Sequence, residues 1–262
     1  MRRTFYLLSL LLLQSLFVWA GNGKDIPSSL DLYVCIGQSN MAGRAELTPE
    51  IMDTLQNVYL LNDKGNFEPA SNPLNRYSTI RKSLSMQRLG PSYAFAKEIE
   101  RKTKRPVGLV VNARGGSSIN AWLKGSKNGY YEKTLSRIRI ALKQGGHLKA
   151  ILWHQGEADC SNPEEYKQKL ILLIKNFRED LGMPELPVIV GQISQWNWTK
   201  REVGTAPFNK MISKISSFIP YSDWVSSKGA DCYKDETDPH FGIKGQLLIG
   251  KRYAKKVYKL YK

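Results

Sequence analysis

Cysteine and histidine are scarce in this chain of 262 residues, with three of each. No Cys-x-x-Cys pair occurs, and Cys35, Cys160 and Cys232 do not have the spacing of a zinc site. We therefore predict no metal and no other cofactor. Cys35 lies within an apolar run and is expected in the core, whereas Cys160 and Cys232 are open to two states, free thiols or a disulfide between loops.

Long apolar runs are also missing after the first twenty residues. At the start, two arginines precede an apolar stretch that ends near Ala20, which is typical of a secretory signal peptide. An uncleaved anchor is the alternative, but two polar residues interrupt the stretch and shorten it. We expect removal of residues 1–20. Residues 21–262 would then form one secreted or periplasmic domain with no integral membrane segment.

Acidic residues are few: 23 Asp and Glu stand against 39 Lys and Arg, a formal charge of +16 at pH 7. The leader contains two arginines and no acid, so the remaining chain carries +14. No nucleic-acid-binding motif accompanies this charge. We therefore expect a solvated basic surface rather than a nucleic-acid partner.

Short apolar strands alternate with amphipathic helices along most of the chain. Strands are predicted at 32–36, 57–62, 106–111, 148–153, 187–193 and 223–226, and helices at 91–104, 130–144, 163–181, 206–217 and 242–260. This alternation predicts an α/β fold with a parallel sheet covered on both faces. Residues 67–90 lack periodicity and are expected to form a long ordered loop.

One serine follows the first predicted strand, at the edge where such sheets bind their ligands. In DLYVCIGQSNMAGR, residues 31–44, the apolar run ends at Gly37 and Ser39 follows. A serine after a strand lies at the carboxyl edge of the sheet, near backbone N–H groups that stabilise an oxyanion. Ser39 is thus a candidate nucleophile, and an ordinary helix-capping serine is the alternative. Met41 occupies the last position of a G-x-S-x-G pattern, which disfavours an α/β-hydrolase.

The histidines differ in their suitability as a base for this serine. His147 lies in a helix-to-strand connection, at the opposite edge of the sheet. His154 follows a strand at the correct edge, where a buried structural imidazole is as reasonable as a base. His240 alone has nearby acids, Asp235 and Asp238, that could orient its ring as a triad requires.

Four motifs occur in order: GQSNMAG at 37–43, ARGGSSINAW at 113–122, ILWHQGEAD at 151–159 and DPHF at 238–241. Together they resemble the SGNH (GDSL-like) hydrolases, in the branch of carbohydrate acetylesterases that includes sialate O-acetylesterases and acetylxylan esterases. The resemblance covers nearly the whole mature chain. It implies a single three-layer α/β/α domain with a mostly parallel, flavodoxin-like sheet, and a serine esterase that removes O-acetyl groups from a carbohydrate substrate.

The resemblance also implies roles for single residues. Ser39 would be the nucleophile and His240 the general base. The oxyanion hole would consist of the backbone N–H groups of Ser39 and Gly116 and the side-chain amide of Gln155, where wider family members have asparagine.

The position of the triad acid differs from the pattern of many relatives. Many relatives carry it three residues before the histidine, where this chain has Thr237. We predict that Asp238 takes the role, with Asp235 as the alternative.

Other residues of the motifs are candidates for substrate contact or for support of the site: Gln38, Asn40, Arg114, Gly115 and Glu157. Arg114 and Glu157 are expected to form an ion pair. The tryptophans of the loops, Trp122, Trp196 and Trp198, either stack on a sugar or cover apolar surface. Two rival functions remain open at this point: a non-catalytic carbohydrate-binding protein of the same fold, and a basic surface-binding protein for nucleic acid or anionic lipid.

Overall fold

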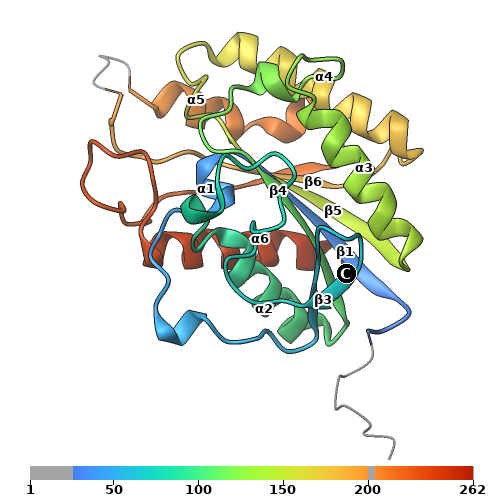
Figure 1. Ribbon diagram of the computed structural model, residues 1–262. Helices are drawn as coiled ribbons and strands as arrows, with labels where there is room; N and C mark the ends of the chain where they lie inside the picture. Colours follow the sequence, from blue (N-terminus) through green and yellow to red (C-terminus); the bar gives the residue numbers. More distant parts are fainter. Residues whose placement is uncertain (1–25, 200–203, 262) are drawn as a thin grey trace, which may run out of the picture.

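The computed structural model describes residues 26–199 and 204–261, so the predicted leader lies outside the described residues. Its centre is a seven-stranded sheet of order β3-β2-β4-β1-β5-β6-β7 (Figure 1). The strands are β1 (Leu30–Gly37), β2 (Val58–Leu61), β3 (Phe67–Pro69), β4 (Val107–Ala113), β5 (Gly146–His154), β6 (Val188–Gly191) and β7 (Ser222–Val225). β3 pairs antiparallel with β2, and the other neighbours are parallel.

The order of the parallel strands confirms the predicted fold class. When β1, β4, β5, β6 and β7 are numbered in chain order, they lie as 2-1-3-4-5, the flavodoxin-like order, and β2 adds a sixth parallel strand beside β4. The direction of winding reverses between β1 and β5. In such sheets, ligands bind beyond the carboxyl ends of the strands at this point, and this is where both β1 and β5 run into motif residues.

Helices cover both faces of the sheet (Figure 1). α2 (Pro91–Thr103) and α6 (Ile243–Tyr258) pack together on one face, while α3 (Tyr130–Lys143), α4 (Pro163–Leu181) and α5 (Ala206–Ile212) cover the other. The shorter elements are α1 (Ser39–Ala42) and the 3₁₀ turns η1 (Pro49–Ile51), η2 (Leu84–Met86), η3 (Ile119–Trp122), η4 (Ile215–Ser217) and η5 (Lys259–Tyr261). The three layers of the implied architecture are therefore present.

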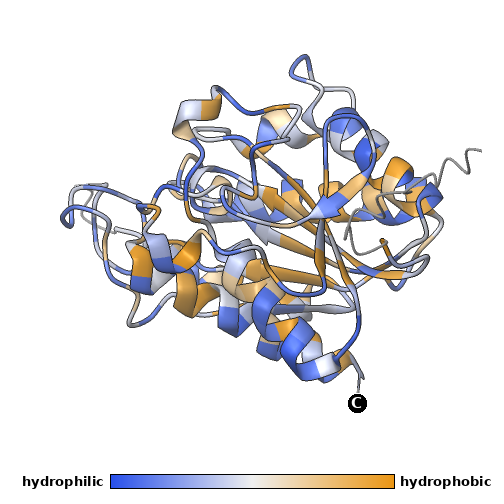
Figure 2. Ribbon diagram, turned by 60° about the horizontal axis from the view of Figure 1, so that its bottom comes forward, coloured by the Kyte–Doolittle hydropathy of each residue, from blue (hydrophilic) through white to orange (hydrophobic). Residues whose placement is uncertain are grey.

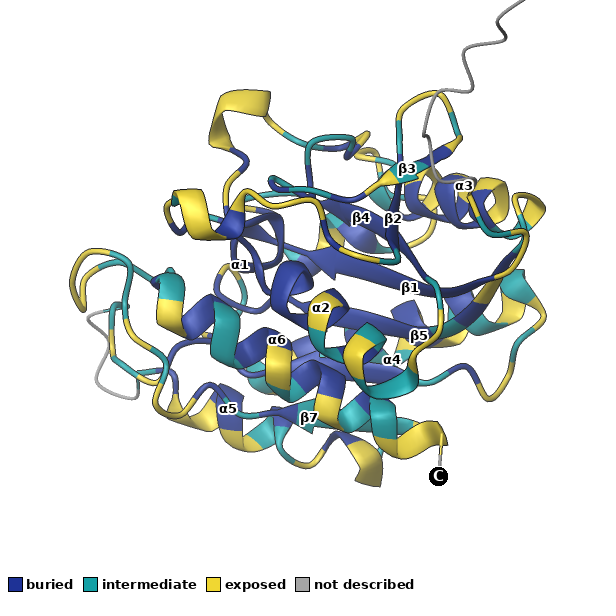
Figure 3. Ribbon diagram, turned by 90° about the horizontal axis from the view of Figure 1, so that it is seen from below, coloured by how far each residue is buried: buried dark blue, intermediate teal, exposed yellow. Residues whose placement is uncertain are grey.

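The core consists of two apolar clusters, one on each face of the sheet. Alternate residues of β1 supply both: Leu32 and Val34 belong to one cluster, and Tyr33 and Cys35 to the other. Every residue of β1 is buried, as Figure 3 shows for the central strands. Apolar residues line the inner strands, and polar residues occupy the outer surfaces of the helices (Figure 2). The central strands are thus rigid supports for the polar residues at their ends.

Two expectations about secondary structure need correction. Residues 67–90 are not all loop, because β3 and the turn η2 lie within them. A three-residue edge strand with one buried side chain, Phe67, is too short to show periodicity. The helix expected at 206–217 is divided into α5 and the turn η4. None of the helices among the described residues combines the length and the apolar character needed to cross a membrane.

Candidate active site

The turn after β1 presents Ser39 to a histidine. Gly37 has φ +139°, and a Cβ there would clash with the carbonyl oxygen of His154 on β5, so the close approach of the two strands requires glycine. Ser39 is the first residue of α1, and the residue at the N-cap is Gln38. The Ser39 hydroxyl caps no helix. Its Oγ lies 2.8 Å from Nε2 of His240 instead.

The loop before α6 brings an acid to this histidine. Asp238 Oδ1 lies 2.6 Å from His240 Nδ1 and also accepts the backbone N–H of His240 at 2.8 Å. The carbonyl oxygen of Asp238 accepts the indole N–H of Trp196 at 2.8 Å. Asp235 faces elsewhere, because its Oδ1 accepts the N–H (2.8 Å) and the hydroxyl (2.5 Å) of Thr237. The structure thus brings Asp238, and not Asp235, to the imidazole.

The protonation of His240 suits proton transfer from the serine. Burial lowers the pKa of His240 below 6.5; Asp238 opposes this change, and the positive charge of Arg44 adds to it. The imidazole is therefore neutral at neutral pH. With Nδ1–H donated to Asp238, the free lone pair is on Nε2 and points at the Ser39 hydroxyl.

A glycine loop after β4 lies against the nucleophile. A Cβ on Gly115 would lie 3.6 Å from the Ser39 Cβ, an ordinary contact, and it would displace Nη2 of Arg44, the end of a flexible side chain. Gly116 is exposed, with φ +71° and open space where a Cβ would be. Within the described part of the chain, the backbone N–H groups of Ser39 and Gly116 donate to no other group.

Gln155 does not have the geometry predicted for it. The residue is fully buried, and its Nε2 lies within hydrogen-bond distance of three protein acceptors: Gln38 Oε1 (3.0 Å), Ser117 O (3.0 Å) and Asp159 Oδ2 (2.5 Å). An amide nitrogen has only two hydrogens, so none is left for an oxyanion. Gln155 instead ties the nucleophile turn and the glycine loop to the end of β5.

The expected ion pair between Arg114 and Glu157 is wrong. Arg114 Nη1 donates to the carbonyl oxygen of Ile80 at 3.2 Å, and no cation pairs with Glu157 among residues 26–199 and 204–261. Glu157 is 6% exposed, and its Oε1 accepts Nδ2 of Asn40 at 2.5 Å. Burial raises the pKa of Glu157 to about 7, as expected for a buried carboxyl without a cation.

The other two histidines lie outside this arrangement. His154 is fully buried, with Nδ1 3.2 Å from the hydroxyl of Tyr253 on α6. Burial lowers the pKa of His154 to about 3, so this imidazole stays neutral in a structural position. His147 is exposed near the amino end of β5, at the opposite edge of the sheet.

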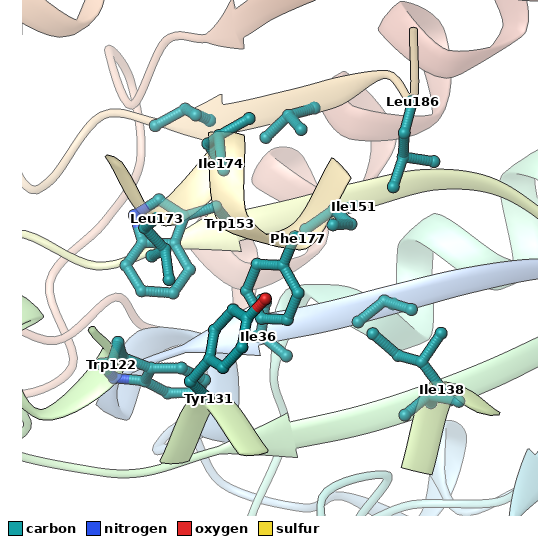
Figure 4. Packing of buried hydrophobic residues seen from close by; sticks show 14 of the residues in the cluster. Ile36, Trp122, Tyr131, Ile138, Ile151, Trp153, Leu173, Ile174, Phe177 and Leu186 are labelled. Carbon is teal, nitrogen blue, oxygen red and sulfur yellow. The ribbon is translucent and has the colours of Figure 1, made fainter. Parts of the chain in front are cut away.

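The tryptophans mostly serve packing. Trp122 is fully buried, and its ring meets Trp153 edge to face with 5.2 Å between centroids (Figure 4). It therefore has no face open to a sugar. Trp198 packs in part against the same cluster. Trp196 holds the loop of Asp238, a contact that the sequence did not indicate.

No disulfide joins Cys160 and Cys232 in the structure, so the pairing considered for them is absent. Cys35 is in the core as predicted.

Two polar residues of the site were not singled out from the sequence. Arg44 lies beside Gly115, and its Nη1 donates to Gly43 O (2.7 Å) and Met86 O (2.8 Å). Asp159 accepts Gln155 and also the hydroxyl of Ser118 at 2.6 Å. Both stand inside or directly after the quoted motifs, which was the available signal.

The chain is similar to known carbohydrate esterases. Residues 29–259 match the family described as carbohydrate esterase, sialic acid-specific acetylesterase. A probable carbohydrate esterase of Arabidopsis thaliana is 32% identical over 239 residues, which are 84% of this chain and 86% of that protein.

Solved structures share the fold. The X-ray structure of the same Arabidopsis protein has a TM-score of 0.74 at 26% identity, over 88% of this chain and 98% of that one. NanS gives 0.64 at 17% identity, over 91% and 99%. A carbohydrate acetylesterase from Xanthomonas citri gives 0.60 at 19% identity, over 86% of this chain and 55% of that one.

Proposed function

The chain belongs to the carbohydrate esterase family of sialic acid-specific acetylesterases, and from this membership we propose that it is a serine esterase that removes O-acetyl groups from a carbohydrate. Members of the family are carboxylic ester hydrolases. One observation carries the assignment of residues: Ser39, His240 and Asp238 are hydrogen-bonded in series, at 2.8 and 2.6 Å.

The proposed reaction is acyl transfer through the serine. Ser39 Oγ attacks the acetyl carbonyl carbon while His240 Nε2 takes the hydroxyl proton. The backbone N–H groups of Ser39 and Gly116 receive the oxyanion. The C–O bond to the sugar then breaks, and the sugar oxygen takes the proton from His240. Water, deprotonated by the same imidazole, attacks the acetyl-enzyme; the bond from Ser39 Oγ to the acetyl carbon breaks, Oγ takes the proton back from His240, and acetate is released.

We further propose that the acetylated sugar is acidic, such as a sialic acid. Arg44 lies beside the nucleophile, and it has no carboxylate within ion-pair distance among the described residues. A carboxylate on the substrate would supply the missing partner. Acetylated neutral polysaccharides are the second candidate, since the implied relatives include acetylxylan esterases.

Two assays test these proposals. Wild type and Ser39→Ala are compared on p-nitrophenyl acetate, and loss of turnover in the variant is expected. Equal rates would favour the non-catalytic carbohydrate-binding protein. Acetate release is then measured on O-acetylated sialic acid, xylo-oligosaccharide and pectic fragments, with Arg44→Gln beside wild type. We expect Arg44→Gln to raise KM for the acidic sugars more than for the neutral one.

We also propose export of the protein, with cleavage after Ala20. Amino-terminal sequencing of protein recovered from outside the cytoplasm tests this, and the expected first residue is Gly21.

A further inference from the structure

The side chain of Asn40 joins the nucleophile turn to the loop that carries His240. Asn40 has no exposed surface. Its Nδ2 donates to the carbonyl oxygen of Pro239 at 3.1 Å, and its Oδ1 accepts the backbone N–H of Phe241 at 3.1 Å. These are the peptide groups on either side of His240. The side-chain amide of Asn40 therefore holds the main chain on both sides of His240, although Phe241 lies 201 positions later in the sequence.

Two further partners fix the direction of this amide. Glu157 Oε1, at the end of β5, accepts Nδ2 at 2.5 Å. Gln246 Nε2, on α6, donates to Oδ1 at 3.3 Å. The nitrogen of Asn40 thus faces two acceptors and the oxygen faces two donors. Turning the amide over would place like groups against each other at all four contacts, so only one orientation is satisfied.

Direct hydrogen bonds between the nucleophile turn and the loop of His240 are few. Among the described residues, the hydrogen bonds between the segments 37–44 and 235–242 come from Ser39 and Asn40 alone. The bond from Ser39 is the reactive one. The bonds from Asn40 are therefore the fixed support that remains when the serine hydroxyl gives up its proton.

We infer that Asn40 is a positioning residue, whose buried amide holds His240 Nε2 at hydrogen-bond distance from Ser39 Oγ. Asn40 and Ser39 are consecutive, with Cα atoms about 3.8 Å apart, so the nucleophile and its support move together. Glu157 acts through Asn40 by fixing the amide. The catalytic consequence rests on the proposed esterase function; the effect on the imidazole does not.

The first test is kinetic. Asn40→Ala removes both contacts that flank His240, and displacement of a base by about 1 Å lowers turnover by up to roughly 10²-fold. We expect kcat on p-nitrophenyl acetate to fall by roughly 10- to 100-fold with KM changed by less than about threefold. Asn72→Ala is the matched control. Asn72 is also buried and donates to a backbone carbonyl, that of Ile51, but it lies in another loop.

The second test needs no substrate. The chain has three histidines, so ¹⁵N-histidine labelling gives a simple imidazole spectrum, and His240→Ala assigns the signal of His240. In wild type, the Nδ1 proton donated to Asp238 should give a downfield resonance protected from solvent. We expect Asn40→Ala to broaden or abolish this resonance, because the loop of Asp238 and His240 is then no longer held against the nucleophile turn and solvent reaches the Nδ1 proton. Asn72→Ala should leave the resonance intact.

A charge swap tests the role of Glu157. Asn40→Asp places a carboxylate oxygen against the oxygens of Glu157 and Pro239, and it keeps the volume of the side chain if Asn40→Ala fails to fold. Adding Glu157→Gln restores a donor for that oxygen. The double variant should recover at least threefold of the kcat lost in Asn40→Asp.

An Asn40→Ala protein with kcat within twofold of wild type and an unchanged Nδ1–H resonance would overturn the inference. An equal loss of resonance in Asn72→Ala would also overturn it, by showing a general effect of destabilisation. If wild type and Ser39→Ala are equally inactive while Asn40→Ala still alters the resonance, the esterase proposal fails and the positioning role stands.

Discussion

Oδ1 of Asp238 lies 2.6 Å from Nδ1 of His240, and the same oxygen accepts the backbone N–H of His240 at 2.8 Å. One carboxylate oxygen therefore fixes both the main chain and the ring of a residue only two positions away. The acid and the base form a local unit within one turn. Their alignment with Ser39, by contrast, depends on contacts between distant parts of the chain.

This local unit predicts which aspartate matters for catalysis. Asp238→Ala should lower kcat/KM by roughly 10²- to 10⁴-fold, because the imidazole loses both its orientation and the charge that stabilises its protonated form. Asp235→Ala should lower it less than about threefold, since Asp235 bonds only to Thr237. Steady-state kinetics on p-nitrophenyl acetate compare the two. A large loss in Asp235→Ala alone would contradict the assignment of the acid.

A second prediction concerns the pH dependence of turnover. The charge of Arg44 opposes protonation of His240, so its removal should raise the pKa of His240. Activity requires the neutral imidazole. In Arg44→Gln the acid limb of kcat/KM should therefore move to higher pH, and the loss of activity should be greater at pH 5.5 than at pH 8. The measurement is a pH profile on an uncharged acetyl ester.

An arginine far from the site provides the control for this profile. Arg101, on α2, is exposed and pairs with Glu98. Arg101→Gln removes the same charge from the chain and should leave the acid limb in place. Equal shifts in both variants would show an effect of net charge rather than of Arg44.

The sequence was sufficient for the parts of the fold that repeat regularly. The strand at 32–36 could be predicted from an uninterrupted apolar run and the helix at 163–181 from apolar residues that recur at helical spacing, and the strand ends then placed Ser39 and Gly116 at one edge. β3 could not, because three residues at a sheet edge carry no period.

For the site, the order of the motifs predicted which residues lie at the same edge of the sheet, but the sequence did not predict which partners their side chains meet. The sequence placed Gln155 at the correct edge, but it could not show that Asp159, four positions later, takes one of its amide hydrogens. For the same reason Arg114 and Glu157 were wrongly paired. The partner of a buried polar group is decided by residues from distant parts of the chain, here Asn40 of α1, and a single sequence does not reveal that choice.

The cysteines supply a third prediction. Cys232 is partly exposed, whereas Cys35 and Cys160 are buried, and burial raises the pKa of the Cys35 thiol. We expect one thiol per chain to react quickly with a thiol reagent in native protein and three after unfolding. Cys232→Ser should abolish the fast reaction. Fewer than three thiols in the unfolded, unreduced protein would indicate a disulfide that the structure lacks.

The last prediction concerns stability and follows from Glu157. Its pKa is raised by burial from 4.5 to about 7, so between these values the folded protein holds a proton that the unfolded chain has lost. The free energy of unfolding should therefore fall as pH rises through this window, by about 3 kcal/mol in total. Glu157→Gln keeps an acceptor for Asn40 and cannot ionise. The free energy of unfolding of Glu157→Gln should therefore not show the decrease that the titration of Glu157 causes in wild type.

Urea unfolding at pH 5, 6, 7 and 8 gives the free energy of unfolding at each pH, and the slope of this free energy against pH is compared between variant and wild type. The slope is the informative quantity, because the new amide also leaves a buried N–H group without a partner and so lowers stability equally at every pH. Glu179→Gln, at an exposed position of α4, should retain the wild-type slope. Parallel curves for Glu157→Gln and wild type would mean that Glu157 is already ionised in the folded protein at pH 5, and that a cation or water compensates its charge.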